Sequence, residues 1–195
     1  MKPIQGWENV KATGDFESLK PGGYVAIIKF VEDDAKKEYL KIQYDIHEGE
    51  FKDYYKELYD SRNFWGGNLY RSYKDTAAGM FKAFTTAVEA SNPRYTWDWN
   101  ERGLINKLVG IVLQEEEYIP TQGENAGKVK TRLIVSDIKS VEEIRMGKFK
   151  VKDKKTLSPN SSSATTAPIQ TFYDNNTFDV VPQQSFDIKD DDLQF

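Results

Sequence analysis

The sequence feature that most constrains the fold is the strict alternation of two kinds of side chain over residues 39–46. The even-numbered residues are apolar or aromatic and share one face of an extended chain: Leu40, Ile42, Tyr44 and Ile46. The odd-numbered residues face the other way: Tyr39, Lys41, Gln43 and Asp45. A period of two is typical of a strand with one buried face, so we predict a β-strand here.

The residues before this run predict its partner. Residues 24–31 follow Gly22-Gly23 and are too apolar for a surface strand and too short for a long helix. We expect them to form a hairpin with residues 39–46. Residues 50–73 are rich in tyrosine and are either irregular or contain a further strand.

A second hairpin is predicted further along the chain. Residues 108–118 begin as a buried strand and end in polar residues. Residues 120–127 suit a loop, and residues 128–135 return with period two. One more short strand is expected near residues 149–151.

One helix is predicted between the two hairpins. Asp75 is a suitable N-cap, the helix runs to Ala90, and Ser91-Asn92-Pro93 ends it. Apolar side chains recur in it at helical spacing, and we interpret them as core packing: Ala77, Met80, Phe81, Phe84 and Val88.

This order of elements indicates a mainly β fold. A hairpin, a third segment, a helix and a second hairpin fit the OB-fold, a five-stranded Greek-key barrel with its helix between strands 3 and 4. An α+β sheet with one packed helix is the alternative.

The composition excludes several kinds of chemistry. The chain has no cysteine, which excludes disulfides, thiol nucleophiles and cysteine metal sites. Its single histidine, His47, is interpreted as a turn residue, and consecutive strand residues such as Glu115, Glu116 and Glu117 point to opposite faces. We therefore expect no metal, no cofactor and no enzymatic activity.

The location of the chain is predicted from what its sequence lacks. No apolar run approaches the roughly 20 residues that a membrane-spanning helix needs. Residues 1–14 have no apolar core and no small-residue cleavage site, so they do not resemble a signal peptide. We expect a soluble, cytoplasmic protein with no membrane partner.

The composition changes abruptly at Ser158, where we place a domain boundary. Residues 1–157 carry 26 basic and 25 acidic residues, whereas residues 158–195 carry Lys189 and six aspartates. Residues 158–168 contain nothing that could anchor a core, so residues 158–195 are predicted to be a disordered linker and acidic tail.

Aromatic residues interleaved with cations are the strongest compositional signal. Of the 26 aromatic residues, 17 lie between Tyr24 and Trp99. Single-stranded nucleic acid is held by this combination, with bases on aromatic faces and phosphates on Lys or Arg. The other interpretation is that these aromatics build the core. The candidate contacts in this region are Tyr39, Lys41, Trp65, Tyr70, Arg71, Tyr73, Lys74, Trp97 and Trp99.

A second candidate is a row of cations on the last predicted strand. Lys128, Lys130 and Arg132 share one face there, with a spacing of about 7 Å. Such a row can contact successive phosphates. A solvated strand face is the alternative.

The C-terminus carries the sharpest motif. Three carboxylates precede two hydrophobic anchors in Asp190-Asp191-Asp192-Leu193-Gln194-Phe195. A partner with an apolar pocket surrounded by Lys or Arg can bind such a peptide. We predict partner-binding roles for Asp190, Asp191, Asp192, Leu193 and Phe195.

This ending resembles the acidic tip of bacterial single-stranded DNA-binding proteins, with Gln194 where that family usually has proline. The body resembles small phage-encoded single-stranded DNA-binding proteins in four segments: residues 23–28, 72–75, 113–118 and 146–151. The resemblance implies an OB-fold and cooperative coating of single strands. It also implies a tail that recruits replication or recombination proteins in an infected bacterial host.

Our first hypothesis is therefore a non-catalytic single-stranded DNA-binding protein of phage DNA replication or recombination, with a homo-oligomer left open. The second is a protein-interaction module whose aromatic groove binds peptides. The third is a nuclease that uses scattered carboxylates.

Overall fold

The alternating segment is a strand with the predicted bounds, β2 (Tyr39–Ile46). It pairs antiparallel with β1 (Gly22–Asp34), which confirms the first hairpin. The computed structural model describes residues 3, 18–121, 123 and 125–157. Apolar side chains on one side of β2 are buried, as the alternation predicts.

The five strands form one sheet in the order β3-β2-β1-β4-β5. β3 (Asn68–Ser72) pairs with β2, and β4 (Leu108–Tyr118) pairs with the other edge of β1. β5 (Lys130–Lys139) lies beside β4. The mainly β class and the helix between strands 3 and 4 are confirmed. Because β3 and β5 are the two edges of this order, the sheet is open, and closure into a barrel stays a prediction.

The chain divides into two compact units. The described part of the first is residues 3, 18–115 and 133–154, and that of the second is residues 116–132 and 155–157, with 122 and 124 excepted. Most of the sheet and all helices of the described residues belong to the first unit. The boundary predicted at residue 158 stays a prediction, because residues 158–195 lie outside the described residues.

The predicted helix is present, with a different start. A 3-10 turn, η2 (Asp75–Ala77), precedes α2 (Ala78–Ser91), so the prediction of Asp75 as the N-cap is wrong. The helix ends at Ser91, one residue later than predicted, and Asn92 follows as the C-cap, with its side-chain amide donating to the carbonyls of Val88 and Leu108. The two hydrogen bonds tie the end of α2 to the start of β4.

The interpretation of the apolar stripe on α2 as core is confirmed for Phe81, Phe84 and Val88, which are buried. Met80 is 42% exposed, so its interpretation as a core residue is wrong. The helical spacing of apolar residues includes Met80 but does not define the edge of the buried face.

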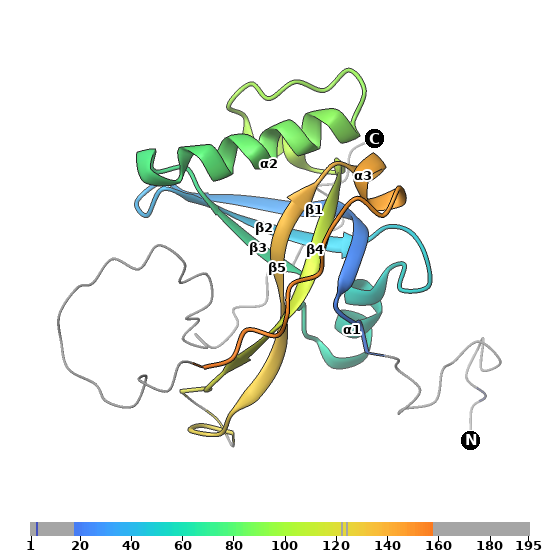
Figure 1. Cartoon of the computed structure of the whole chain (residues 1–195), viewed down its shortest axis with the longest axis vertical. Coiled ribbons are helices and arrows are strands. Elements are labelled where there is room, and N and C mark those ends of the chain that lie inside the picture. Colours follow the sequence, from blue (N-terminus) through green and yellow to red (C-terminus); the bar gives the residue numbers. More distant parts are fainter. Residues whose placement is uncertain (1–2, 4–17, 122, 124, 158–195) are drawn as a thin grey trace. The chain divides into compact units, whose positions relative to one another are not determined.

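Three short helices lie outside the predicted elements. They are α1 (Tyr54–Arg62), the 3-10 helix η3 (Glu101–Leu104) and α3 (Val141–Arg145). α3 begins with a capping box in which Ser140 and Glu143 bind each other's backbone N–H groups. In Figure 1, α2 and α1 lie on opposite sides of β1–β3.

Two predicted strand segments differ from the structure. Residues 149–151 form no strand, although the chain there runs past the sheet. The last strand covers Lys130–Lys139 and not residues 128–135, so Lys128 belongs to the preceding loop. Its backbone N–H donates to the carbonyl of Asn125 within that loop.

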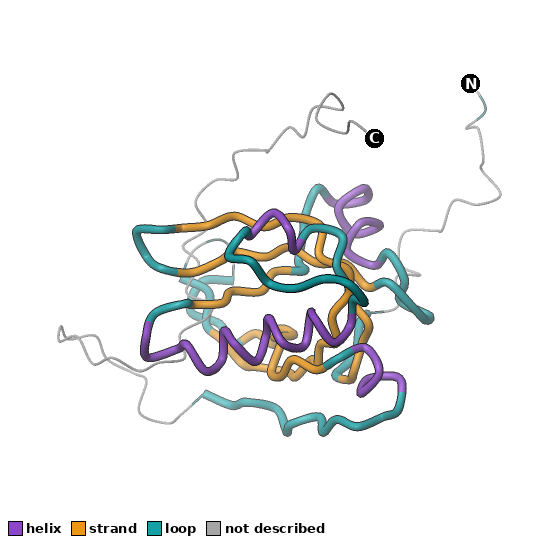
Figure 2. Tube along the Cα trace, turned by 90° about the horizontal axis from the view of Figure 1, so that it is seen from above, coloured by secondary structure: helices purple, strands orange, loops and turns teal. Residues whose placement is uncertain are grey.

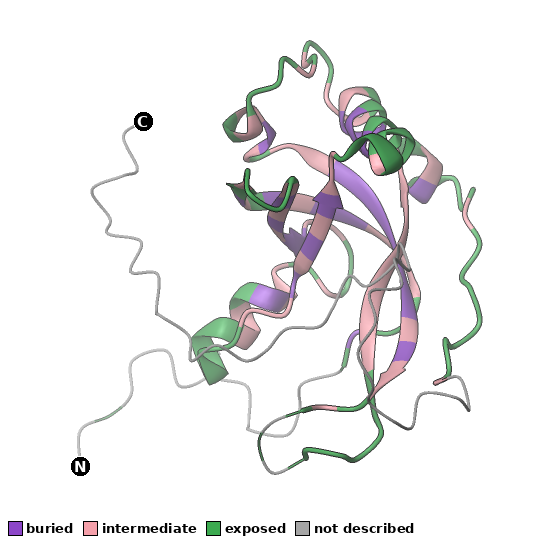
Figure 3. Ribbon diagram, turned by 90° about the vertical axis from the view of Figure 1, so that its left-hand side faces the viewer, coloured by how far each residue is buried: buried purple, intermediate pink, exposed green. Residues whose placement is uncertain are grey.

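The core fills the side of the sheet that faces α2. Figure 3 shows buried residues along the strands and the inner side of α2. The buried cluster is contributed by β1, β2, β4 and α2, and its largest fully buried members are Phe84, Ile28, Ile42, Ile46 and Ile111. A smaller cluster covers the other side of β1 and β4: Val25, Val112, Val141 and Ile144, with Phe149 packed against it.

Candidate functional site

The half-buried, outward-facing residues of β2 and β3 form a surface that we call the β2–β3 outer face: Tyr39, Lys41, Gln43, Asn68, Tyr70 and Ser72. The strand register places Lys41 opposite Tyr70 and Tyr39 opposite Ser72. The rings of Tyr39 and Tyr70 meet edge to face, with 5.7 Å between their centroids. The register therefore brings three predicted contacts together: Tyr39, Lys41 and Tyr70.

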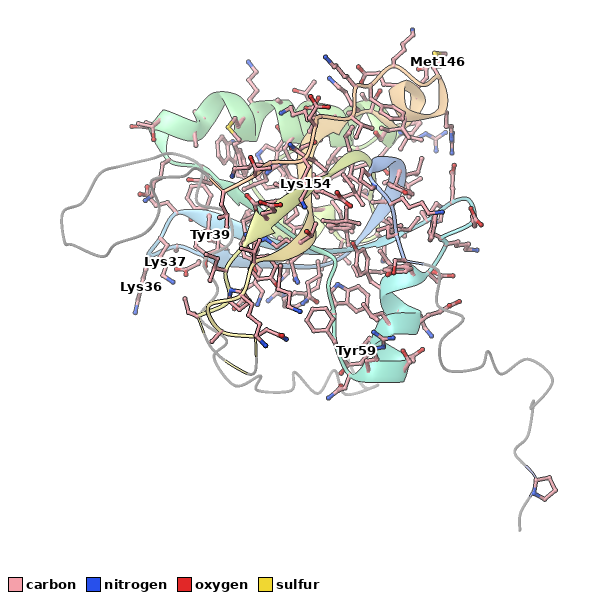
Figure 4. The ribbon with its side chains drawn as sticks, turned by 60° about the horizontal axis from the view of Figure 1, so that its bottom comes forward. Lys36, Lys37, Tyr39, Tyr59, Met146 and Lys154 are labelled. Atoms are coloured by element: carbon pink, nitrogen blue, oxygen red, sulfur yellow. The ribbon has the colours of Figure 1, made fainter. Side chains whose placement is uncertain are left out.

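The charges around this surface are mixed. The Nζ of Lys37 lies 6.0 Å from the centre of the Tyr39 ring, and the Nζ of Lys41 lies 3.8 Å from a carboxylate oxygen of Glu32. Figure 4 shows Lys36, Lys37 and Tyr39 at the β1–β2 turn. Lys36 and Lys37 are exposed cations that the sequence analysis did not select.

The tyrosines of this surface are neutral. Burial raises the pKa of Tyr70, and Tyr39 and Glu32 raise it further. Burial likewise raises the pKa of Tyr39. Uncharged phenol rings next to a lysine can hold bases without repelling phosphates.

Tyr73 and Lys74 follow β3 and join the strand to α2. The hydroxyl of Tyr73 donates to Asp33 at 2.8 Å, and this hydrogen bond, with some burial, raises the pKa of Tyr73 to about 12. The Tyr73 ring also contacts Phe81. Tyr73 is therefore held by neighbours within the fold, whereas the Lys74 side chain is exposed.

Arg71 is placed differently from the other predicted contacts. Its side chain is 7% exposed, and one guanidinium nitrogen donates to the carbonyl of Tyr70. Burial lowers the pKa of Arg71 to about 10, and the nearby carboxylate of Asp137 opposes this. We therefore leave Arg71 out of the proposed contact surface, because its charge lies inside the fold.

Trp65 packs beside α1. Its indole N–H donates to the carbonyl of Gly67 at 3.2 Å, and its ring contacts Tyr55 and Tyr59. Figure 4 shows Tyr59 on α1. Trp65 is half-buried, so only part of its ring could meet a ligand.

The two other tryptophans among the predicted contacts, Trp97 and Trp99, lie against α2. The Trp99 ring is 78% exposed and lies nearly parallel to the Phe81 ring, at 18° and 6.3 Å. Its backbone has a φ of 66°, which is uncommon for a bulky residue. Trp97 is half-buried and contacts both rings. The loop therefore exposes most of the Trp99 side chain to solvent.

The row predicted at Lys128, Lys130 and Arg132 lies in the second unit. Lys128 and Lys130 are exposed, but Arg132 binds a carboxylate oxygen of Glu116 through two nitrogens, at 2.7 and 3.0 Å. The Lys155 Nζ binds the other oxygen at 2.6 Å. Burial alone would raise the pKa of Glu116, but these two cations hold it below its ordinary value. Two members of the row thus stay exposed cations, and the third is committed to an internal ion pair.

The predicted partner-binding residues lie outside the described residues: Asp190, Asp191, Asp192, Leu193 and Phe195.

The sequence analysis missed one set of exposed cations, at every second position of residues 148–154. The signal for these cations is the alternation of lysine, which overlaps the short strand predicted near residues 149–151.

The described residues contain no cluster of three or more His, Asp or Glu side chains that could hold a metal ion. None of their helices is long and apolar enough to cross a bilayer. No protein-family model matches the chain, and no curated protein is significantly similar to it.

Proposed function

We propose that this chain is a non-catalytic single-stranded DNA-binding protein with an OB-fold, acting in phage DNA replication or recombination. The observation that carries the proposal is the Tyr39–Tyr70 pair beside Lys41 on the β2–β3 outer face. OB-folds bind oligonucleotides across strands 2 and 3 and the adjoining loops. The strand order and the position of α2 between β3 and β4 are compatible with that fold.

The proposed mechanism combines stacking with charge. Bases stack on Tyr39 and Tyr70, while phosphates contact Lys41 and the lysines of the β1–β2 turn. Each base stack contributes about 1–3 kcal/mol without sequence preference. Lys128 and Lys130 offer further phosphate contacts in the second unit. Residues 190–195 are proposed to recruit replication or recombination proteins.

Replacing Tyr39 or Tyr70 by alanine tests the proposal. Each variant should bind oligo-dT about 5- to 150-fold more weakly, as the loss of one stack predicts. Tyr39→Phe and Tyr70→Phe are matched controls that keep the ring and should keep the affinity. Titration by fluorescence anisotropy, with duplex DNA as the competitor, measures both. Equal affinity of the alanine variants and the wild type would overturn this site.

One observation favours the alternative of a peptide-binding module. Met80 on α2 and Trp99, whose ring stacks on Phe81 of α2, are exposed apolar side chains. If they bind a peptide, Trp99→Ala should abolish binding to a protein partner and leave oligo-dT binding unchanged. A parallel loss of oligo-dT affinity would instead assign Trp99 to nucleic acid.

A further inference from the structure

Lysine occupies every second position of the segment that follows α3. We call these residues the lysine row: Lys148, Lys150, Lys152 and Lys154. All four are exposed. Figure 2 shows the chain after α3 as an extended trace without a helix, and Figure 4 labels Lys154. In an extended chain, alternate side chains project to the same side about 7 Å apart.

The row is fixed to the sheet. A Cβ atom added to Gly23 would lie 2.5 Å from the ring of Phe149, so this ring rests directly on the backbone of β1. The Nζ of Lys152 donates to the carbonyl of Ser136 on β5 at 3.2 Å. The cations are thus presented by a segment that is anchored on two strands of the first unit.

The row is strongly cationic. Residues 148–154 contain four lysines and one acidic residue, Asp153, a net charge of +3. Lys148 also lies close enough to Glu143 to help lower the pKa of that carboxyl, whose main hydrogen-bond partner is Ser140. Because alternate residues of an extended chain lie about 7 Å apart, Lys148 and Lys150 can meet separate phosphates.

The start of the lysine row and the proposed site lie at different ends of β1. Gly23 carries Phe149, whereas Asp34 pairs with Tyr39. Ten residues of β1 lie between Gly23 and Asp34, with a bulge between Ile28 and Phe30. We therefore expect a short oligonucleotide on the β2–β3 outer face to end before Lys148 and Lys150, which flank Phe149 at the Gly23 end of β1.

We propose that the lysine row is a second track for the phosphates of single-stranded DNA, engaged by strands long enough to extend beyond the β2–β3 outer face. This inference rests on the proposed function and adds a dependence on strand length. A short strand binds by stacking on the tyrosines. A longer strand adds ion contacts along the row, so its affinity depends more steeply on salt.

The test compares wild type with the full-length double variant Lys148→Gln/Lys150→Gln. The probes are labelled oligo-dT strands of about 5 and about 16 nucleotides, near the limits for one OB-fold. Anisotropy titrations over a range of salt should show unchanged binding of the short strand. The long strand should bind the variant more weakly, and its salt slope should be shallower by about 1.4, since each lost contact removes about 0.7. Lys52→Gln/Lys82→Gln removes two exposed lysines elsewhere and should change neither strand.

The outcomes separate this inference from the function on which it rests. If the long strand keeps its full salt slope while the short strand binds normally, the second track is overturned and the proposed function stands. If wild type binds neither strand, the proposed function fails and the track fails with it. If polyglutamate binds wild type but not the variant, and the long strand is unaffected, the row serves an acidic protein partner instead.

Discussion

Asp45 shows how one buried carboxylate organises a helix. It is fully buried, and its two oxygens accept the backbone N–H groups of Ile46, Tyr55 and Lys56 at 2.8–3.1 Å. Two of these N–H groups belong to the first turn of α1. Asp45→Asn replaces one acceptor oxygen by an amide that faces these donors. We expect the variant to lose about 2 kcal/mol of unfolding free energy, measured by urea denaturation.

Asp53 offers a matched control for Asp45. It is the N-cap of α1, but its side chain makes no capping hydrogen bond, and its φ of 59° is one that asparagine tolerates. Asp53→Asn should change the unfolding free energy by no more than about 0.5 kcal/mol. Equal urea midpoints for Asp45→Asn and Asp53→Asn would show that the Asp45 carboxylate does not hold α1.

Glu116 predicts a pH dependence of stability. Its pKa lies below the ordinary value because Lys155 and Arg132 outweigh the effect of burial. A lowered pKa in the folded state means that the ionised carboxylate stabilises the fold above its ordinary pKa of about 4.3. This contribution is lost as the pH falls through the folded-state pKa.

The variant Glu116→Gln should therefore be less stable than wild type at neutral pH, by about 1–3 kcal/mol. The difference should shrink as the pH falls and vanish once the wild-type carboxyl is protonated. Urea denaturation of both proteins between pH 7 and about pH 3 measures it. A difference that persists at the acid end would show that the lost ion pairs are not its cause.

At the scale of elements, β1 and the segment after α3 depend on one close contact. Phe149→Ala removes the ring that covers Gly23 and should cost about 2–3 kcal/mol. Gly23→Ala places a methyl group where the ring lies and should cost about 1–3 kcal/mol. In the double variant the methyl group occupies space that the ring has left. The double variant should therefore lose less unfolding free energy than the sum of the two single losses.

Gly79→Ala is the control for this cycle. A Cβ at Gly79 meets nothing within 4 Å, and the position lies in α2, where alanine is favoured over glycine. It should be neutral or slightly stabilising, and additive with Phe149→Ala. Chemical denaturation of the single and double variants provides the coupling energies. Strict additivity of Gly23→Ala and Phe149→Ala would contradict the direct contact.

The elements that the sequence predicted are those with a clear period. β2 has the predicted bounds because one of its faces is buried along the whole strand. α1 was missed because its residues show no apolar stripe, and it is held by Asp45, which lies ten residues before Tyr55. Asp45 itself appeared to be a polar residue on a solvent face. A contact of this kind depends on the tertiary fold and leaves no local pattern.

The candidate site was predictable only in part, for the same reason. Alternation placed Tyr39 and Lys41 on one face, and strand pairing then brought Tyr70 to them. Arg71 directly follows Tyr70, so it points to the other side of β3 and is buried. Its position in a cluster of aromatics and cations could not show this, because residues 68–72 had no predicted strand period.

At the scale of the whole molecule, the distribution of charge matters more than its sum. The chain carries a net charge of -4, yet we expect single-stranded DNA to bind and to be displaced by salt. The reason is that phosphates respond to nearby lysines, such as those of the β1–β2 turn. A gel shift at increasing salt checks this. Binding that does not weaken with salt would indicate that stacking alone holds the strand.

The acidic segment of residues 158–195 should have two separable effects, one on DNA binding and one on partner recruitment. They carry six aspartates and one lysine, so they can compete with DNA for the cations of the same chain at high local concentration. Deleting residues 158–195 should tighten oligo-dT binding at low salt and leave the unfolding free energy unchanged. It should also abolish the recruitment of replication or recombination proteins.

Deletion of Phe195 alone separates these two effects. It keeps all six aspartates of residues 158–195 and removes the terminal hydrophobic anchor. We expect oligo-dT affinity to stay almost unchanged, because the competing charge remains. Partner capture from an infected-host extract should be lost, since an apolar pocket has nothing to hold. Unchanged capture by the Phe195 deletion would mean that the tip is not the docking peptide, whatever the full deletion does to DNA binding.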